Sequence, residues 1–211
     1  MKSSSNNDYY SRVRTWPSLF PIVGGAQFLD IGCGKGVLGS YLKDKYSAKV
    51  TGLEIYPEYA SEASECLDEV LCGNFEDIDL SSQDGQFDYV IFSDSLEHLV
   101  EPKAALLKAK ALLKESGELL IAIPNVRNFR VTVPLVVFGN FEYQDEGLLD
   151  RTHLRFFTLS SIKNMLVSCG FCVQSVEMDL PKSSKVGLVN MLTFSVFRES
   201  LTSHFFIRAT I

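Results

Sequence analysis

The stretch Gln27-Phe-Leu-Asp-Ile-Gly-Cys-Gly-Lys-Gly36 decides the fold of this chain. Its first five residues are mostly apolar, as in a buried strand, and the three glycines that follow permit a tight turn and a close backbone approach to a ligand. A helical pattern begins at Val37, so the free N–H groups of its first turn face the same loop. The stretch therefore predicts a strand, a ligand-binding turn and a helix in direct succession.

Short apolar runs alternate with helical patterns along the rest of the chain, which is typical of a parallel sheet covered on both faces. The predicted strands are 27–31, 49–53, 69–72, 87–92, 118–123, 171–178 and 204–211, and the predicted helices are 37–46, one from Pro57, 102–115, one after Thr158 and 189–201. Residues 1–15 form a lead-in, and the irregular residues 124–157 are an insertion that we expect to act as a lid. A single α/β domain over 1–211 is the economical interpretation.

The composition narrows the classes of protein. Lys and Arg number 20 against 26 Asp and Glu, a net charge of −6, which argues against a nucleic-acid-binding protein. No apolar run approaches the ~20 residues of a membrane-spanning helix, and the polar first residues do not resemble a signal peptide. Five cysteines, an odd number, in a chain that needs no disulfides indicate a reducing, cytoplasmic compartment. We expect a small-molecule substrate, and the sequence carries no signal for the oligomeric state.

The residues after the first two strands suggest the ligand, because open α/β sheets bind ligands beyond the carboxyl ends of their strands. Glu54 follows the second strand, and an exposed carboxylate there can accept hydrogen bonds from two ribose hydroxyls. Asp30 lies beside the glycines at positions 32, 34 and 36, where its charge suits an ammonium group and repels a pyrophosphate. This pattern favours a cationic nucleoside over a dinucleotide.

A nicotinamide-dependent oxidoreductase is the competing interpretation. Gly34-Lys-Gly36-Val-Leu-Gly39 matches the GxGxxG pattern, and Glu54 follows Gly34 at the spacing that a dinucleotide fold requires. In that fold, however, the first glycine follows the strand directly, whereas Asp30-Ile-Gly32-Cys33 precedes Gly34 here.

The glycine stretch together with Glu54 resembles the class I S-adenosylmethionine-dependent methyltransferases. The resemblance implies a Rossmann-like, doubly wound seven-stranded sheet of order 3-2-1-4-5-7-6 with the last strand antiparallel. It also implies that S-adenosylmethionine is the cofactor, and that Asn74, where the family commonly has Asp, faces the adenine. The cofactor-binding residues that we predict are Asp30, Gly32, Cys33, Gly34, Glu54, Ile55, Asn74, Phe75, Ser93, Leu96, Tyr10 and Arg14.

A narrower resemblance covers nearly the whole chain. Leu96-Glu-His-Leu99, Ile123-Pro-Asn-Val126, Leu148-Leu-Asp-Arg-Thr-His-Leu-Arg-Phe-Phe-Thr158 and the Tyr9-Tyr10 lead-in with Arg14 are similar to a bacterial group of methionine-biosynthesis-like or ubiquinone-type methyltransferases. This resemblance implies methyl transfer to an oxygen or nitrogen, less readily a carbon, of a small molecule. A cofactor-binding protein that regulates a partner enzyme without catalysis is the alternative.

Two histidines are the candidate catalytic bases, because an imidazole with a pKa of ~6.5 can accept a proton near neutral pH. His98 follows the fourth strand and His153 lies in the predicted lid. Each has a second interpretation, since His98 can fill a turn and His153 can lock the lid with Asp150 and Arg151. His204, in the last strand, is expected to lie away from the ligand crevice, and no spacing of His, Cys, Asp and Glu indicates a closed metal site.

Overall fold

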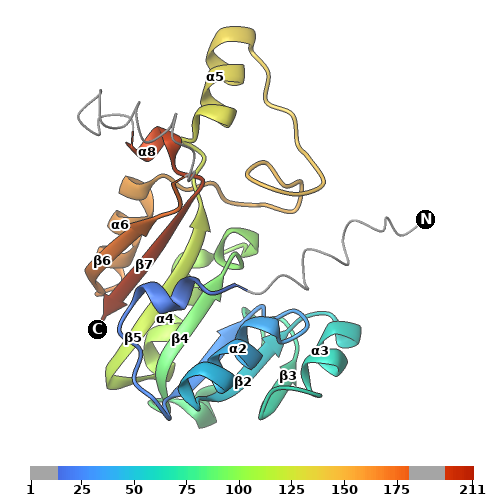
Figure 1. Cartoon of the computed structure of the whole chain (residues 1–211), viewed down its shortest axis with the longest axis vertical. Coiled ribbons are helices and arrows are strands. Elements are labelled where there is room, and N and C mark those ends of the chain that lie inside the picture. The colour runs from blue at the N-terminus through green and yellow to red at the C-terminus, as the bar shows by residue number, and fades with distance from the viewer. Residues whose placement is uncertain (1–13, 181–197) are drawn as a thin grey trace.

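The computed structural model of the chain describes residues 14–180 and 198–211, and it contains one seven-stranded sheet of order β3-β2-β1-β4-β5-β7-β6 (Figure 1). The strands are β1 Gln27–Ile31, β2 Lys49–Glu54, β3 Glu69–Cys72, β4 Phe87–Ser93, β5 Leu113–Pro124, β6 Cys172–Met178 and β7 His204–Thr210. β7 pairs antiparallel with both β5 and β6, whereas the other neighbouring pairs are parallel. The predicted fold, strand order and antiparallel last strand are confirmed.

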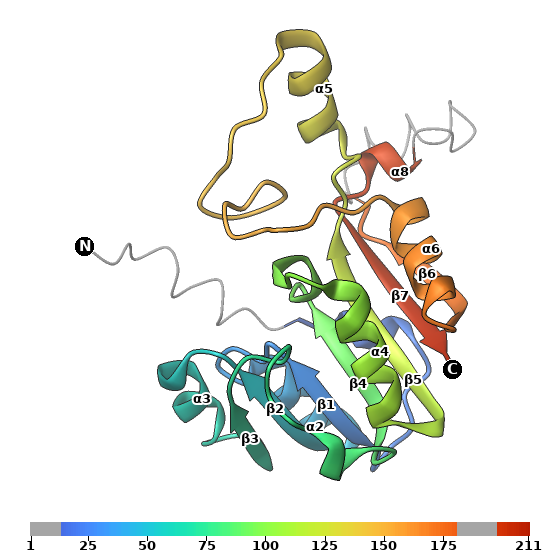
Figure 2. The ribbon, with the colours of Figure 1, turned by 180° about the vertical axis from the view of Figure 1, so that it is seen from behind.

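Helices cover both faces of the sheet, as Figures 1 and 2 show from opposite sides. The helical elements are η1 Trp16–Leu19, α2 Val37–Tyr46, α3 Pro57–Ala63, η2 Ser81–Gln83, η3 Leu96–His98, α4 Pro102–Leu112, α5 Phe129–Phe138, α6 Leu159–Ser168 and α8 Arg198–Leu201. η1 and α2 pack on one face around Trp16 and Phe28, while α4 and α6 pack on the other around Leu106 and Ile162. The two hydrophobic clusters fix the central strands, and with them the loops at their carboxyl ends.

The central strand β1 follows directly from its sequence. Phe28, Leu29 and Ile31 are almost fully buried because β1 is covered on both faces, and the next residues turn sharply at Gly32, whose φ is +77°. Gly36, with φ of +78°, is the N-cap of α2, and a Cβ there would lie 2.7 Å from Sγ of Cys66. Only glycine fits this position, so the loop between β1 and α2 is specified by its glycines.

The boundary between α4 and β5 differs from the sequence prediction. The helix predicted for 102–115 ends at Leu112, and β5 begins at Leu113 rather than at Glu118. The carbonyl oxygens of Ala111 and Leu112 accept the N–H groups of Gly85 and Gln86, at 2.9 and 3.1 Å. These tertiary hydrogen bonds satisfy the end of the helix and start the strand beside Phe87, a cause that the local pattern cannot show.

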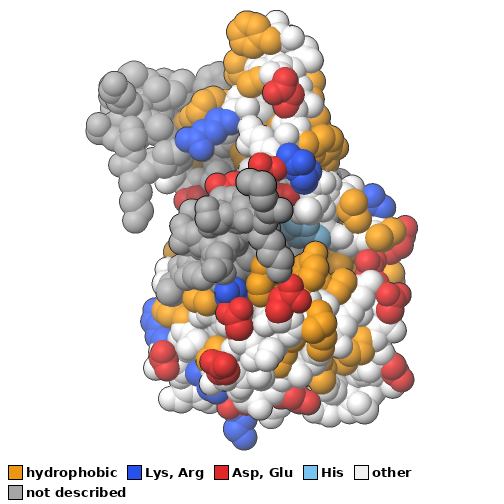
Figure 3. Space-filling model, turned by 90° about the vertical axis from the view of Figure 1, so that its right-hand side faces the viewer, with side chains coloured by type: hydrophobic (Ala, Val, Ile, Leu, Met, Phe, Trp, Pro, Cys, Tyr) orange, Lys and Arg blue, Asp and Glu red, His pale blue; other side chains and the backbone are white. Residues whose placement is uncertain are grey.

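The insertion after β5 contains a helix that the sequence did not predict. Residues 124–157 were expected to be irregular, but α5 occupies Phe129–Phe138 and projects beyond the sheet (Figures 1 and 2). Asn128 caps it by accepting the N–H of Arg130 at 3.0 Å, although Pro134 lies inside the helix. Val136 and Phe138 are 81% and 77% exposed, and Figure 3 shows apolar side chains on this projecting part.

Two further predictions concern the end of the chain and the membrane. Of the helix predicted for 189–201, residues 189–197 lie outside the described residues, and α8 spans Arg198–Leu201. Within residues 14–180 and 198–211, no helix has the length and apolar character that crossing a membrane would require. All five cysteines of the chain are free thiols.

Candidate functional site

The glycine loop after β1 and the end of β2 are joined by one carboxylate. Oε2 of Glu54 accepts the N–H of Gly34 at 2.9 Å, and its Oε1 accepts the N–H of Tyr56 at the same distance. Glu54 was expected to be exposed, but its side chain is buried because it is the last residue of β2 and turns back toward the loop. Each oxygen retains capacity for one more hydrogen bond, so the carboxylate can still accept ribose hydroxyls.

Asp30 is a buried carboxylate without a compensating hydrogen bond. It is 1% exposed, and neither of its oxygens has a hydrogen-bond partner among the residues that the structure describes. Burial raises the pKa of Asp30 to about 7, an effect that Arg14 opposes and Glu54 reinforces. A carboxyl group in this position is suited to a ligand that brings positive charge, because the ligand would supply the missing partner.

The other predicted cofactor residues near this loop differ in how far their side chains are buried. The side chain of Cys33 lies in the core against Gly52, and its N–H donates to the carbonyl of Leu53, so its atoms are already engaged. Phe75 and Leu96 are also core residues, whereas Ile55 is 53% exposed at the end of β2. The predicted contacts of these side chains with a cofactor stay predictions, and Ile55 alone of them presents a free apolar surface.

Asn74 uses both ends of its amide within its own turn. Its Oδ1 accepts the N–H of Glu76 at 3.0 Å, and its Nδ2 donates to Oδ2 of Asp77 at 2.8 Å. The turn holds the segment after β3 beside the carboxyl edge of the sheet, which is where an adenine-binding residue would have to lie. Its adenine contact stays a prediction.

The lead-in reaches the end of β4 through two side chains. Arg14 forms an ion pair with Asp94 and donates to the carbonyl oxygen and Oγ of Ser93, at 3.3 and 3.4 Å. Nε1 of Trp16 also donates to Oγ of Ser93, at 3.1 Å. The structure therefore places Arg14 beside Ser93, their contacts with a cofactor stay predictions, and Tyr10 lies outside the described residues.

A buried Glu–His pair follows β4. Glu97 lies in η3 and is fully buried, and its carboxylate oxygens accept no hydrogen bond from another described residue. Nε2 of His153 lies 3.8 Å from Oε1 of Glu97. Burial raises the pKa of Glu97, with the charge of Asp94 adding to the effect, and burial lowers the pKa of His153, with His98 adding to it. Both shifts favour the uncharged forms, so a neutral carboxyl beside a neutral imidazole is favoured over an ion pair.

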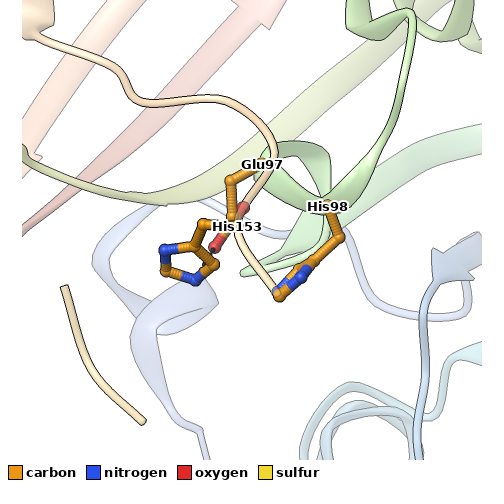
Figure 4. A group of neighbouring side chains, drawn as sticks. All are labelled: Glu97, His98 and His153. Carbon is orange, nitrogen blue, oxygen red and sulfur yellow. Dashed lines mark ion pairs between the residues drawn. The ribbon is translucent and has the colours of Figure 1, made fainter. Parts of the chain in front are cut away.

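His98 belongs to the same cluster, as Figure 4 shows. The ring centroids of His98 and His153 are 4.8 Å apart, and Nδ1 of His98 lies 3.1 Å from the carbonyl oxygen of Thr152. Because a carbonyl only accepts, Nδ1 carries the proton and Nε2 of the neutral ring is an acceptor. Sequence reasoning found both histidines but missed Glu97, which stands next to His98 and shows no sign of burial in the local pattern.

The insertion 124–157, predicted to act as a lid, is attached to this cluster through the main chain. The carbonyl oxygen of Glu97 accepts the N–H groups of both Leu154 and Arg155, each at 3.0 Å. Oδ1 of Asp150 accepts the N–H and the hydroxyl of Thr152, at 2.8 and 2.6 Å, which shapes the turn before His153. These bonds fix His153 over Glu97, so lid attachment and a chemical role are compatible in one residue.

Comparison with known proteins agrees with this geometry. Residues 9–176 match the model of a family described as a methyltransferase domain. The chain belongs to this methyltransferase domain family. A solved S-adenosylmethionine-dependent methyltransferase from Archaeoglobus fulgidus has the same fold, with a TM-score of 0.68 and 18% identity over 97% of this chain and 94% of the other. The predicted family and its cofactor, S-adenosylmethionine, are confirmed.

Two curated relatives of this methyltransferase chain carry the name ubiquinone biosynthesis O-methyltransferase. The one from Coxiella burnetii is 29% identical over 56% of this chain and 52% of its own length. The one from Xanthomonas oryzae is 31% identical over 49% of this chain and 45% of its own length. The chain thus spans about half the length of the curated relatives that it matches.

The residues of the methyltransferase chain fit this cofactor. Asp30 offers an unpartnered buried carboxylate to a ligand that carries both an ammonium and a sulfonium charge. Glu54 is held by two backbone N–H groups in an orientation that leaves further acceptor capacity for hydroxyls. Gly32 comes so close to the loop after β4 that a Cβ there would lie 2.9 Å from Cβ of Ser95, which keeps the loop and η3 in contact.

The cluster of Glu97, His98 and His153 is also a group of potential metal-binding side chains. Glu97, His98 and His153 each offer one ligand atom, and these atoms all lie within 4.8 Å of one another. The sequence indicated no closed metal site, because His153 joins the other two residues only through the fold of the lid. Glu97 and His153 are buried, so electrostatic interactions within the group are stronger than they would be in water.

His204 corrects a prediction of the sequence analysis. It was expected to lie away from the ligand crevice, but its Nε2 lies 3.6 Å from Oδ1 of Asp94, the residue after β4. β7 is antiparallel, so its first residue lies at the edge where the parallel strands end, and His204 is opposite Pro124 at the end of β5. The strand was predicted correctly, but its direction brings the histidine to the site.

Proposed function

We propose that this chain transfers the methyl group of S-adenosylmethionine to an oxygen or nitrogen of a small-molecule acceptor. The observation that carries the proposal is the unpartnered carboxylate of Asp30 beside the loop that Gly34 and Glu54 hold together. His98, after β4, and His153, in the insertion 124–157, supply the second requirement, a group that can remove the proton of the acceptor. The name of the curated relatives makes an oxygen acceptor the first to test.

Bound S-adenosylmethionine supplies a methyl group that is already activated by its sulfonium. The protein then has to align the acceptor in line with that methyl and keep water away, which can account for several kcal/mol of the barrier. His153 accepts the acceptor's proton, and Glu97, whose Oε1 lies 3.8 Å from Nε2 of His153, positions the ring. His98 contacts His153 and takes its orientation from the carbonyl of Thr152.

Calorimetry with S-adenosylhomocysteine is the first test. We expect binding of this compound and none of NAD at millimolar concentration, since Asp30 repels a pyrophosphate. Tight binding of NAD with no binding of S-adenosylhomocysteine would reject the proposal in favour of an oxidoreductase.

Transfer is tested with S-adenosylmethionine labelled in its methyl group and incubated with cell extract. Label recovered in a small molecule supports the proposal, and the variant His153→Asn should lose most of it while binding S-adenosylhomocysteine normally. Co-purification of a second enzyme with no label transferred would instead indicate a regulator. Loss of transfer in EDTA, with recovery on adding a divalent metal salt, would indicate that the cluster of Glu97, His98 and His153 binds a cation rather than accepting the proton of the acceptor.

A further inference from the structure

A cavity of about 420 Å³ lies between the start of the described chain and the beginning of β7. Its lining includes Arg14, Trp16, Asp94, Asp179, His204 and Phe206. Trp16 and Phe206 stack on each other, with ring centroids 5.5 Å apart and an interplanar angle of 7°. The cavity therefore combines an aromatic wall with ionisable groups, and its volume is in the range of small-molecule sites.

A chain of hydrogen bonds sets the proton on the ring of His204. The hydroxyl of Ser203 donates to Oδ2 of Asp179 at 2.7 Å, and its oxygen lies 3.2 Å from Nδ1 of His204. Because the hydroxyl has only one proton, it accepts from His204, and Nδ1 is the protonated nitrogen. In the neutral ring, Nε2 is then an acceptor.

Nε2 of His204 faces a second acceptor. Oδ1 of Asp94 lies 3.6 Å away, too far for a direct hydrogen bond, and this buried oxygen has no hydrogen-bond partner among the described residues. The other oxygen of Asp94 is engaged by Arg14. A hydrogen-bond donor placed between Nε2 of His204 and Oδ1 of Asp94 would satisfy both acceptors.

The pair lies next to the cofactor loop. Asp94 directly precedes Ser95, and Cβ of Ser95 would lie 2.9 Å from a Cβ on Gly32. The cavity therefore borders the same loop after β4 that contacts the cofactor loop at Gly32.

We propose that this cavity is the acceptor-binding subsite and that Asp94 and His204 together bind an amino or hydroxyl group of the acceptor. The proposal rests on the methyltransferase function proposed above. The charged side chains that line the cavity include two carboxylates, Asp94 and Asp179, and one guanidinium, Arg14. A carboxylate or phosphate on the acceptor is therefore disfavoured. The acceptor class is a neutral or cationic small molecule with a donor group, and Trp16 and Phe206 favour an apolar or aromatic body.

Four probes of similar size test this class at pH 8 in the presence of S-adenosylhomocysteine: benzylamine, benzyl alcohol, benzyl methyl ether and benzoate. Ligand-observed NMR should detect binding of the amine and the alcohol, at least fivefold tighter than that of the ether or the benzoate. His204→Asn keeps a donor toward Ser203 but removes the atom that faces Asp94, so binding of the amine should fall at least fivefold. His204→Gln restores a polar group at that place and should recover part of it.

The affinity for S-adenosylhomocysteine is measured on the same variants by calorimetry and should change less than twofold. Equal binding of the ether, preference for benzoate, absence of binding by all four probes, or an unchanged amine affinity in His204→Asn would each overturn the subsite. Asn164→Ala, an exposed position on α6, serves as the matched control. Failure of the wild-type chain to bind S-adenosylhomocysteine would reject the proposed function instead, and the probe measurements without cofactor would still report on the cavity.

Discussion

The amide nitrogen of Gly34 lies 2.9 Å from Oε2 of Glu54 and donates a hydrogen bond to it, which ties the loop after β1 to the end of β2. Glu54 also accepts the N–H of Tyr56, so both its oxygens are oriented by backbone groups before any ligand arrives. Such preorganisation lowers the cost of binding, because the carboxylate does not have to be ordered by the ligand. The loop and the acidic residue after β2 therefore act as one unit.

Replacing Glu54 by alanine should weaken binding of S-adenosylhomocysteine by about 10- to 150-fold, because loss of charge-assisted hydrogen bonds corresponds to about 1.5–3 kcal/mol. The free energy of unfolding should also fall, since the N–H of Gly34 loses a buried acceptor. Calorimetry and urea unfolding measure the two effects. Glu58→Ala, at an exposed position of α3, should alter neither, and a dissociation constant for Glu54→Ala within twofold of the wild type would contradict this role.

Asp30 should make the stability of the protein without cofactor fall as pH rises from about 4 to about 7. Burial raises the pKa of Asp30 from 3.8 to about 7, so in this window the native state holds a proton that the unfolded chain has released. The native state then binds more protons, and the free energy of unfolding decreases with pH by up to about 4 kcal/mol.

The variant Asp30→Asn isolates this contribution, because Glu97 and other groups titrate in both proteins. Urea unfolding across pH 4–8 should give a flatter curve for Asp30→Asn than for the wild type, with the largest difference at pH 8. Parallel curves would show that Asp30 is ionised in the native state throughout. Binding of S-adenosylhomocysteine should be weaker in this variant, since the carboxylate is the partner offered to its ammonium group.

The sheet could be predicted from the sequence because its central strands are specified locally. Glycines that can adopt the positive φ of the turn follow β1, α3 and α4 begin at Pro57 and Pro102, and Thr158 forms a capping box with Ser161. The start of β5 and helix α5 could not be predicted in the same way. Leu113 becomes a strand residue through tertiary contacts, and the β-branched run of α5 with its internal Pro134 has a poor helix propensity.

The candidate site was predictable where one loop carries it and unpredictable where distant segments meet. Asp30 and Glu54 lie at the ends of strands that are adjacent in the sheet, and Gly34 follows the first of them, so their proximity follows from the topology. The pairing of Glu97 with His153 depends on the path of the lid, and that of Asp94 with His204 depends on the direction of β7. The spacing of these residues in the sequence therefore predicts neither contact.

Gly32 should tolerate alanine much less well than Gly85 does, although both have a positive φ, of +77° and +67°. A Cβ on Gly32 would lie 2.9 Å from Cβ of Ser95, whereas nothing lies within 4 Å of one on Gly85. We expect Gly85→Ala to cost about 1–2 kcal/mol for its backbone conformation alone, and Gly32→Ala about 2–4 kcal/mol in the free energy of unfolding. Urea unfolding compares them, and equal losses would mean that the loop after β4 moves away freely.

His153 should set the lower pH limit of methyl transfer. Burial and the neighbouring His98 lower the pKa of His153, so its ring stays neutral and able to accept a proton at a lower pH than a solvent-exposed histidine does. The acid limb of the rate of labelled methyl transfer should therefore lie below the ordinary histidine pKa. Glu97→Gln removes the carboxylate that holds His153 and should lower the rate at every pH by about 10- to 1000-fold, while the affinity for S-adenosylhomocysteine is retained. His98→Asn should lower the rate less than Glu97→Gln does, because His98 only contacts the ring of His153. A pH limit that is the same in His153→Asn as in the wild type would assign the proton to another group.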